Sequence, residues 1–337
     1  MSEIRRGIER GSKLEYEEDR EQFLILPDGR RMAYKNRGRE NDYPIFFLHG
    51  TPGGKDGPLP RNLSLRLGGV RLIVPDRSGY GGSDRDPDRS ISSIAEDIAF
   101  LADSLGIDRF SVAGRSGGAP HALACAALLK DRVQSALALV SIAPPDAQGL
   151  DWYAGMGPGN VAEYELVDSF LKGSLSATRT INALRANTTD AMRSGNFIDL
   201  ELRSQLPLPD RRVIGDAAIR SALNVGFENA AANEDNLVVP PDPLDGSRAY
   251  VSGQYDDHIA FRTPWGFDPA DITCPTLLWH GKEDIFSPFS HSEWLQARIP
   301  GSVLDASPEQ AHFGAIEAFP FLLTWVRMNA MIPRSRD

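Results

Sequence analysis

The chain alternates short apolar runs with amphipathic stretches, and this alternation limits its fold more than any other feature of the sequence. Each run carries hydrophobic residues on both faces and is soon followed by glycine or proline, as in strands that helices cover on both sides. The runs lie at residues 45–48, 71–74, 110–113, 136–142 and 276–279. Helical periodicity falls at residues 91–105, 119–129, 290–299 and 315–328. This order predicts an α/β fold with a mostly parallel, doubly wound sheet.

The first part of the chain departs from the alternation. Residues 1–20 form a polar, charged segment that we expect to lie outside the core. Residues 23–26 and 31–36 have the pattern of strands and flank a Pro-Asp-Gly turn, which predicts an antiparallel hairpin. Further along, Ser90 and Ser92 are the candidates to cap the first long helix.

A long stretch after the sixth expected strand contains no convincing buried strand. Residues 161–171 form an amphipathic stripe, and residues 213–227 predict another helix. Proline, asparagine and aspartate punctuate the remainder. We therefore expect a helical cap over residues 145–265, inserted between two parts of an α/β core that cover residues 21–144 and 266–331.

Composition narrows the classes of function. The formal net charge is −10, so nucleic acids and anionic membrane surfaces are repelled on average. The sequence shows no run of about 18 apolar residues and no secretory signal, so we expect a cytoplasmic protein that meets a small-molecule substrate. Cys125 and Cys274 lie far apart in apolar surroundings and predict neither a disulfide framework nor a metal site. The oligomeric state stays open.

The strongest signal for chemistry is Gly114-Arg115-Ser116-Gly117-Gly118, which follows an expected strand and opens an expected helix. A serine in such a turn has its hydroxyl lifted out of the backbone, and Gly114 and Gly118 remove Cβ atoms that would clash. The spacing alone is weak evidence, because it arises by chance in roughly one chain in ten of this length. The strand–turn–helix context makes Ser116 the candidate nucleophile. The alternative is a glycine-rich turn without a nucleophile, or one that binds phosphate at the helix N-terminus.

A second loop, residues 49–54, follows an earlier strand of the same sheet. Acyl transfer builds negative charge on the former carbonyl oxygen, and two fixed N–H donors must meet that charge. We expect one donor from Gly117 and the other from this loop. The proline after Thr51 has no N–H, so Thr51 is the candidate for the oxyanion hole. His49 and Gly50 are expected to support the loop; the alternative is a plain turn.

A serine hydroxyl becomes an effective nucleophile when an imidazole takes its proton. His312 is the candidate base because it lies between a late strand and the last helix. Asp284, in the loop after the last buried run, is the candidate carboxylate that orients His312, and Glu283 is its competitor. The order serine, aspartate, histidine matches a triad built on strand ends. His121, one helical turn beyond the elbow, is a candidate to face the pocket.

Together these motifs resemble those of the α/β-hydrolase superfamily, in the serine-nucleophile branch with a helical cap. The resemblance covers roughly residues 22–330. Beside the elbow, it is carried by the loop 49–54, by the segment Asp76-Arg77-Ser78-Gly79-Tyr80-Gly81-Gly82-Ser83 and by residues 277–284 and 310–314. It implies an enzyme that uses Ser116, Asp284 and His312 as a triad and needs no metal or organic cofactor.

Two departures narrow the expected activity. Dehalogenases and epoxide hydrolases of this family use an aspartate at the elbow, so Ser116 argues against both. Proline iminopeptidases are similar in the loop 49–54 but usually carry glycine where Thr51 stands, which makes an aminopeptidase a less favoured alternative. Arg115 is an unusual cation beside the nucleophile, and it could pair with a core carboxylate or touch the substrate.

We therefore expect hydrolysis of an ester, lactone or thioester of a mid-sized, mainly apolar molecule through an acyl-enzyme. Aromatic and apolar residues of the expected cap would shape the pocket, although packing within the cap is the commoner role for each. They are Trp152, Tyr153, Met156, Tyr164, Phe170, Met192 and Phe197. The alternatives on the same fold are a lyase, a cofactor-free oxygenase, an acyltransferase or a small-molecule receptor. A complete triad argues against a receptor, because binding alone does not need one.

Overall fold

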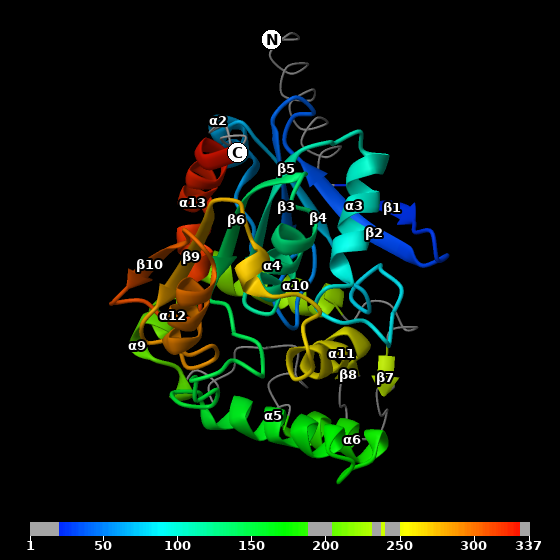
Figure 1. Ribbon diagram of the computed structural model, residues 1–337, viewed down its shortest axis with the longest axis vertical. Helices are drawn as coiled ribbons and strands as arrows, with labels where there is room; N and C mark the ends of the chain where they lie inside the picture. The colour runs from blue at the N-terminus through cyan, green and yellow to red at the C-terminus, as the bar shows by residue number, and fades with distance from the viewer. Residues whose placement is uncertain (1–19, 188–203, 231–236, 240–249, 331–337) are drawn as a thin grey trace, which may run out of the picture.

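A computed structural model describes residues 20–187, 204–230, 237–239 and 250–330. At its centre lies an eight-stranded sheet with the strand order β1-β2-β4-β3-β5-β6-β9-β10 (Figure 1). The strands are β1 Gln22–Ile25, β2 Arg31–Arg37, β3 Tyr43–Leu48, β4 Val70–Pro75, β5 Phe110–Arg115, β6 Val133–Leu139, β9 Thr276–Gly281 and β10 Val303–Ser307. β1 and β2 form the predicted antiparallel hairpin, and β2 also pairs antiparallel with β4. The remaining neighbours pair in parallel, which confirms the expected α/β fold.

Helices cover both faces of the sheet (Figure 1). They are α2 Asn62–Gly68, α3 Ile94–Ser104, α4 Gly118–Leu128, α12 Phe289–Arg298 and α13 Gly314–Ala330, with a short 3-10 turn, η2 Pro269–Asp271, before β9. Successive side chains of a strand point to opposite faces. Phe46 of β3 therefore packs into the hydrophobic cluster that contains α3, α4 and α12, whereas Phe47 packs into the cluster that contains α2 and α13. Burial on both faces explains why the strands appear as continuous apolar runs.

The first long helix begins later than predicted, and its expected cap is wrong. α3 starts at Ile94, after Ser93, and no side chain caps it. Ser90 and Ser92 hydrogen-bond to each other instead, with their hydroxyl oxygens 2.8 Å apart. The Ser90 amide also donates to Ser93 Oγ at 2.9 Å. The serines thus satisfy one another in a turn, which removes them from the role of helix cap.

The insertion between β6 and β9 is mainly helical and lies beyond one end of the sheet (Figure 1). Its described helices are α5 Pro158–Leu171, α6 Ala177–Asn187, α9 Leu208–Val213, α10 Ala217–Ala230 and α11 Ser252–Phe261. It also contains two short strands, β7 Leu237–Val239 and β8 Tyr250–Val251, which pair antiparallel with each other and not with the main sheet. Strands this short leave no readable alternation in the sequence, which is why none was expected there.

The helix predicted over residues 213–227 corresponds to α10, which begins later than expected. α9 ends at Val213 and α10 begins at Ala217. Between them, Asp216 Oδ1 accepts the amide N–H groups of Ala218 and Ile219 at 2.8 and 3.1 Å. This is the contact by which an aspartate starts a helix. Apolar periodicity continues across the break, so the periodic pattern concealed a start signal that Asp216 provides.

Candidate active site

Ser116 occupies the sharp turn between β5 and α4. Its φ is 53°, a left-handed conformation that is uncommon outside glycine. A Cβ at Gly114 would lie 2.2 Å from the Gly118 carbonyl oxygen, and one at Gly118 would lie 2.1 Å from that of Leu48. Only glycine therefore fits at positions 114 and 118, two residues before and two residues after the serine. The strained turn presents Ser116 to a pocket at the end of the sheet, as the motif predicted.

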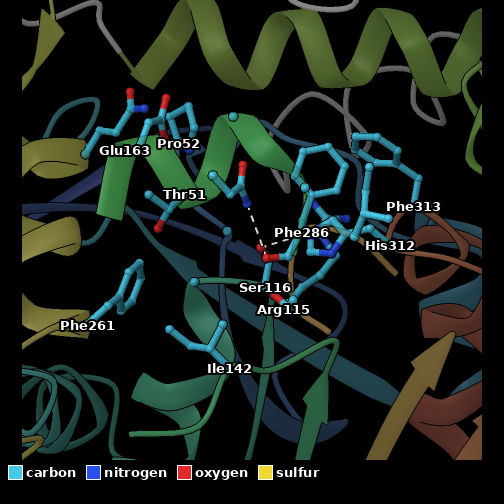
Figure 2. Close-up of a pocket in the computed structure, with 18 of the residues that line it drawn as sticks. Thr51, Pro52, Arg115, Ser116, Ile142, Glu163, Phe261, Phe286, His312 and Phe313 are labelled. Atoms are coloured by element: carbon cyan, nitrogen blue, oxygen red, sulfur yellow. Dashed lines mark hydrogen bonds between the residues drawn. The ribbon is translucent and has the colours of Figure 1, made fainter. Parts of the chain in front are cut away.

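The structure brings the candidate base to the candidate nucleophile (Figure 2). His312 Nε2 lies 3.0 Å from Ser116 Oγ, so the hydroxyl can donate to the imidazole. On the other side of the ring, Nδ1 lies 2.8 Å from Asp284 Oδ2. Since a carboxylate accepts hydrogen bonds, this contact places a proton on Nδ1 and leaves Nε2 free to accept. The arrangement matches the chemistry required of a serine–histidine–aspartate set.

Asp284 rather than Glu283 approaches the histidine. Asp284 is buried, whereas Glu283 is exposed. Burial alone would raise the pKa of Asp284, but the charge of His312 and hydrogen bonds from His280 and His312 outweigh it and hold that pKa well below its usual range. The amides of Phe286 and Ser287 also donate to Asp284 Oδ1 at 2.8 and 3.0 Å. Asp284 is thus an ionised, fully oriented acceptor.

A second histidine contacts the same carboxylate, and the sequence analysis missed it. His280 Nε2 donates to the Ser287 carbonyl at 2.6 Å and lies 3.3 Å from Asp284 Oδ2. Its Nδ1 lies 2.7 Å from Ser292 Oγ. His280 is the penultimate residue of β9, four residues before Asp284, and that spacing was the available signal. By contrast, His121 is buried, contacts the Gly117 carbonyl at 2.8 Å and does not line the pocket.

The two loops expected to supply the oxyanion donors meet beside the nucleophile. A Cβ built on Gly117 would lie 2.1 Å from Thr51 Oγ1, and one built on Gly50 would lie 3.3 Å from the Cβ of Ser116. Thr51, Gly50 and Gly117 all line the same pocket as Ser116. The structure thus brings the two loops together beside Ser116, and the oxyanion-hole role of Thr51 and Gly117 stays a prediction.

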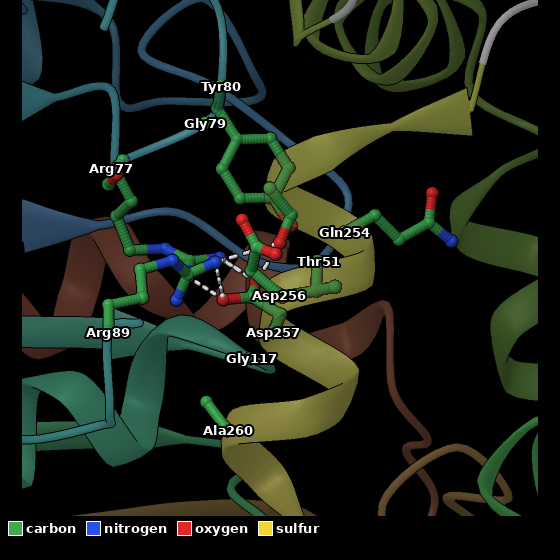
Figure 3. A network of polar contacts seen from close by, with 12 residues as sticks. Thr51, Arg77, Gly79, Tyr80, Arg89, Gly117, Gln254, Asp256, Asp257 and Ala260 are labelled. Atoms are coloured by element: carbon green, nitrogen blue, oxygen red, sulfur yellow. Dashed lines mark hydrogen bonds and ion pairs between the residues drawn. The ribbon is translucent and has the colours of Figure 1, made fainter. Parts of the chain in front are cut away.

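A buried network of charges holds the Thr51 loop (Figure 3). Arg77 donates two hydrogen bonds to Asp257, at 2.6 and 2.7 Å, and Arg89 forms an ion pair with the same carboxylate at 2.6 Å. Tyr80 donates to Asp257 at 2.7 Å, and Thr51 Oγ1 donates to it as well. Asp257 belongs to α11, so one residue of the insertion fixes a loop of the core.

His49 joins that network to the backbone. Its Nδ1 donates to the Gly50 carbonyl at 2.8 Å, and its Nε2 accepts the Arg77 amide N–H at 3.0 Å. Arg77 Nη2 donates to the Gly50 carbonyl at 3.1 Å. Burial and the neighbouring charge of Arg77 hold the pKa of His49 well below its usual value, so the ring is neutral. These contacts give His49 and Gly50 the supporting position expected of them.

The pocket has a volume of about 720 Å³ and lies between the strand ends and the insertion (Figure 2). On the insertion side, Leu206, Leu223, Phe227 and Phe261 supply apolar surface, and Asn160, Gln205 and Gln254 lie among them. Of the cap residues expected to shape it, only Tyr164 among those described lines it, while Trp152 packs against Tyr164, His291 and Arg262 instead. Met192 and Phe197 lie outside the described residues.

One polar pair faces the apolar pocket. His258 Nε2 lies 3.2 Å from Glu163 Oε2, and its Nδ1 lies 2.8 Å from the Gln254 carbonyl. Both acceptors require a proton on the ring nitrogen, so His258 is an imidazolium that neutralises Glu163. Burial opposes this state, but the hydrogen bond and charge of Glu163 raise the pKa of His258 above its usual value.

Fold and site together define an α/β hydrolase. The family profile for the alpha/beta hydrolase fold matches residues 43–319, and the chain belongs to this family. It is an enzyme of that family, similar to a non-heme chloroperoxidase of Streptomyces lividans, with 25% identity over 303 residues, 89% of this chain and 95% of the relative. It is also similar to a 2-hydroxymuconate semialdehyde hydrolase of Pseudomonas putida, with 26% identity over 87% of this chain and 88% of that one.

A solved structure shows the same fold. A thermophilic esterase from Thermogutta terrifontis matches with a TM-score of 0.61 at 19% sequence identity. The match covers 93% of this chain and 100% of the esterase chain. In the described part of the chain, no helix is long and apolar enough to cross a membrane. No group of three or more His, Cys, Asp or Glu residues in that part is placed to hold a metal ion.

Proposed function

We propose that this α/β hydrolase cleaves an ester, lactone or thioester through an acyl-enzyme formed on Ser116. The observation that carries the proposal is the 3.0 Å separation of Ser116 Oγ and His312 Nε2, with Asp284 on the opposite nitrogen of the ring. An imidazole in this position takes the hydroxyl proton as the oxygen bonds to carbon. Relatives named hydrolase and esterase support the same reaction class.

The proposed reaction has two halves. In the first, Ser116 Oγ attacks the carbonyl carbon and His312 accepts the hydroxyl proton. The backbone N–H groups of Gly117 and Thr51 donate hydrogen bonds to the oxyanion. His312 then gives the proton to the leaving group, and the acyl group stays on Ser116. In the second, water attacks the acyl-enzyme while His312 removes a proton from the water. His312 then returns that proton to Ser116 Oγ as the bond between Oγ and the acyl group breaks, and the acid leaves. Asp284 keeps the imidazole oriented throughout.

We also propose that the insertion, residues 145–265, acts as a cap that forms one wall of the substrate pocket. Its apolar side chains, Leu206, Leu223 and Phe227, face the catalytic loops across the cavity. A cavity of about 720 Å³ falls within the range of small-molecule sites. The apolar lining favours a mid-sized substrate with few polar groups near the insertion.

Covalent labelling tests the nucleophile. A fluorophosphonate probe should label the wild-type protein, and labelling should disappear in Ser116→Ala. Ser104→Ala, at the exposed end of α3, is the matched serine control and should label like the wild type. Equal labelling of the wild type and Ser116→Ala would remove Ser116 from the mechanism.

Solvent isotope incorporation separates hydrolysis from the other chemistry this fold supports. In water enriched in ¹⁸O, hydrolysis of the acyl-enzyme must place one solvent oxygen in the product acid. The chloroperoxidase relative makes this test pertinent, since its name denotes a reaction other than hydrolysis. Turnover without solvent oxygen in the acid would favour transfer to another acceptor. Ligand binding without turnover, unaffected by His312→Ala, would favour a receptor.

A further inference from the structure

The residue before the nucleophile contributes a positive charge to the pocket. Arg115 is the last residue of β5 and lines the cavity beside Ser116 (Figure 2). Its guanidinium donates through Nη1 to the Pro58 carbonyl at 3.3 Å. A guanidinium carries five N–H donors, so this long contact uses only part of its capacity.

In the described part of the chain, no carboxylate forms an ion pair with Arg115. Burial lowers the pKa of Arg115 to about 10, and no neighbouring carboxylate opposes that effect. The guanidinium is still protonated at neutral pH. Arg115 is partly buried, and a charge with reduced access to water is ordinarily paired with an opposite charge, because lost hydration is otherwise uncompensated.

The described carboxylates near the pocket do not pair with Arg115. Glu163 is neutralised by His258, and Asp284 faces His312 and His280. Asp210 accepts the Phe313 amide at 2.7 Å. None of them compensates Arg115. The pocket therefore contains one cation whose opposite charge is not supplied by the described residues.

Other buried arginines show that this is a local exception. Arg77 and Arg89 share Asp257, and Arg262 forms two hydrogen bonds with Asp168 at 2.7 and 2.8 Å. The protein itself supplies the opposite charge of each of those arginines. Arg115 differs because no described carboxylate pairs with it and because it lines a cavity of about 720 Å³, large enough for a ligand.

We propose that Arg115 is an anion subsite and that the substrate is an ester or lactone that carries a carboxylate near the scissile bond. The proposal rests on the proposed hydrolase function. A carboxylate matches the fork of a guanidinium and can accept two N–H bonds from it. A single guanidinium in a mainly apolar pocket suits a monoanion better than a phosphate dianion, which calls for more donors. Because Arg115 and Ser116 line the same pocket, we expect the carboxylate and the reacting carbonyl to belong to one mid-sized substrate.

The test compares charged and neutral esters of equal length. Monoethyl esters of α,ω-dicarboxylic acids carry the carboxylate on the acyl side, and ethyl alkanoates are their neutral matches. Acetoxyalkanoic acids carry it on the alcohol side, and their methyl esters are the neutral matches. The measured quantity is the ratio of kcat/KM for the charged ester to that for the neutral one. In the wild type we expect a ratio above 10 at one chain length in one series.

Substitution of Arg115 should remove that preference. In Arg115→Met the ratio should fall about 10- to 100-fold, as for loss of a hydrogen bond to a charged group. Arg115→Lys should keep part of the preference, because it keeps the charge and loses the fork. Arg212→Gln is the control for long-range charge, since Arg212 is an exposed cation on α9 outside the pocket, and it should leave the ratio unchanged.

The possible outcomes distinguish failure of the anion-subsite proposal from failure of the proposed hydrolase function. If the wild type hydrolyses neutral esters and its ratio is one or less in both series, the anion subsite is wrong and the hydrolase proposal stands. If Arg115→Met is labelled by the fluorophosphonate and keeps the wild-type ratio, another group binds the carboxylate and the inference is overturned. If neither ester class is hydrolysed and Ser116 is not labelled, the hydrolase proposal itself fails. Should Arg115→Met not fold, the wild-type ratio and Arg115→Lys decide.

Discussion

Two buried aspartates flank the nucleophile and differ in their partners. Asp284 contacts two imidazoles, His312 and His280, whereas Asp257 contacts two guanidiniums, Arg77 and Arg89. Burial alone would raise the pKa of either carboxyl, but the positive partners of each outweigh burial and lower it. An imidazole exchanges its proton near neutral pH, and a guanidinium does not. One cluster can therefore move a proton, and the other can only hold a loop in place.

The largest effect on activity should come from a change in the cluster of Asp284, His312 and His280. Asp284→Asn should lower kcat/KM about 10⁴-fold, because an amide cannot hold His312 in the tautomer that accepts from Ser116. Steady-state kinetics on the best ester found would measure the loss. Glu283→Gln is the matched control, since Glu283 is adjacent but exposed, and it should change kcat/KM less than about threefold. An equal loss in both variants would show that the two carboxylates were wrongly distinguished.

A change in the cluster of Asp257, Arg77 and Arg89, called the holding cluster here, should mainly affect the free energy of unfolding. Asp257→Asn leaves Arg77 and Arg89 buried without their counter-charge, which should lower the free energy of unfolding by about 3–5 kcal/mol. Urea unfolding measures this. Asp256→Asn is the neighbouring control. Its partner Arg85 is partly exposed, so Arg85 can be rehydrated and the loss should be smaller.

Activity of Asp257→Asn should also fall, because the Thr51 loop loses its anchor. A variant with wild-type stability but no activity would contradict the separation of the two clusters. In that case Asp257 would act on the reacting atoms rather than through the loop.

A third buried aspartate tests the role of the partners. Asp210 has no cation in contact, and one of its oxygens, Oδ2, has no hydrogen-bond partner among the described residues. Burial raises the pKa of Asp210 from 3.8 to about 6. Its folded state therefore binds the proton more tightly than the unfolded state, and this contribution is present below about pH 4 and lost as the pH rises through about 6.

Asp210→Asn should remove that pH dependence. At pH 7.5 the variant should be more stable than the wild type by on the order of 2 kcal/mol, and the difference should shrink toward pH 4. Urea unfolding between pH 4 and pH 8 measures it. The amide oxygen of asparagine can still accept the Phe313 amide, so the backbone contact is preserved. A difference that does not change with pH would show that Asp210 is not the titrating group.

The smallest effect should come from the hydroxyl that joins Thr51 to the holding cluster. Thr51→Val removes the hydrogen bond to Asp257 and keeps the amide proposed for the oxyanion hole. We expect a loss of about 1 kcal/mol in stability and a decrease of at most about tenfold in kcat/KM. Thr51→Ser keeps the hydroxyl and should remain close to the wild type. Complete loss of fluorophosphonate labelling in Thr51→Val would show that the hydroxyl, not the amide, matters most.

Much of the fold and the chain order of the candidate triad could be predicted from the sequence. Gly114 and Gly118 predict a sharp turn around the serine. The structure confirms that both positions require glycine, because a Cβ added at either would lie less than 2.5 Å from a backbone oxygen. The starts of α10 and α3 were predicted too early. Asp216 accepts two amide hydrogen bonds at the start of α10, and Ser93 accepts the Ser90 amide in the turn before α3; apolar periodicity reports neither contact.

What the sequence by itself determined is therefore the set of local elements: buried strands, their helices and the glycine-flanked serine between them. Only the tertiary structure decided which distant charges meet. Asp257 reaches Thr51 across 206 positions of the chain and Arg77 across 180. Periodicity and turn chemistry act over a few residues, whereas the pairing of a buried charge depends on every element packed around it. That is why the partners of Asp257 became visible only in the folded chain, as did the lack of a carboxylate beside Arg115 among the residues that the structure describes.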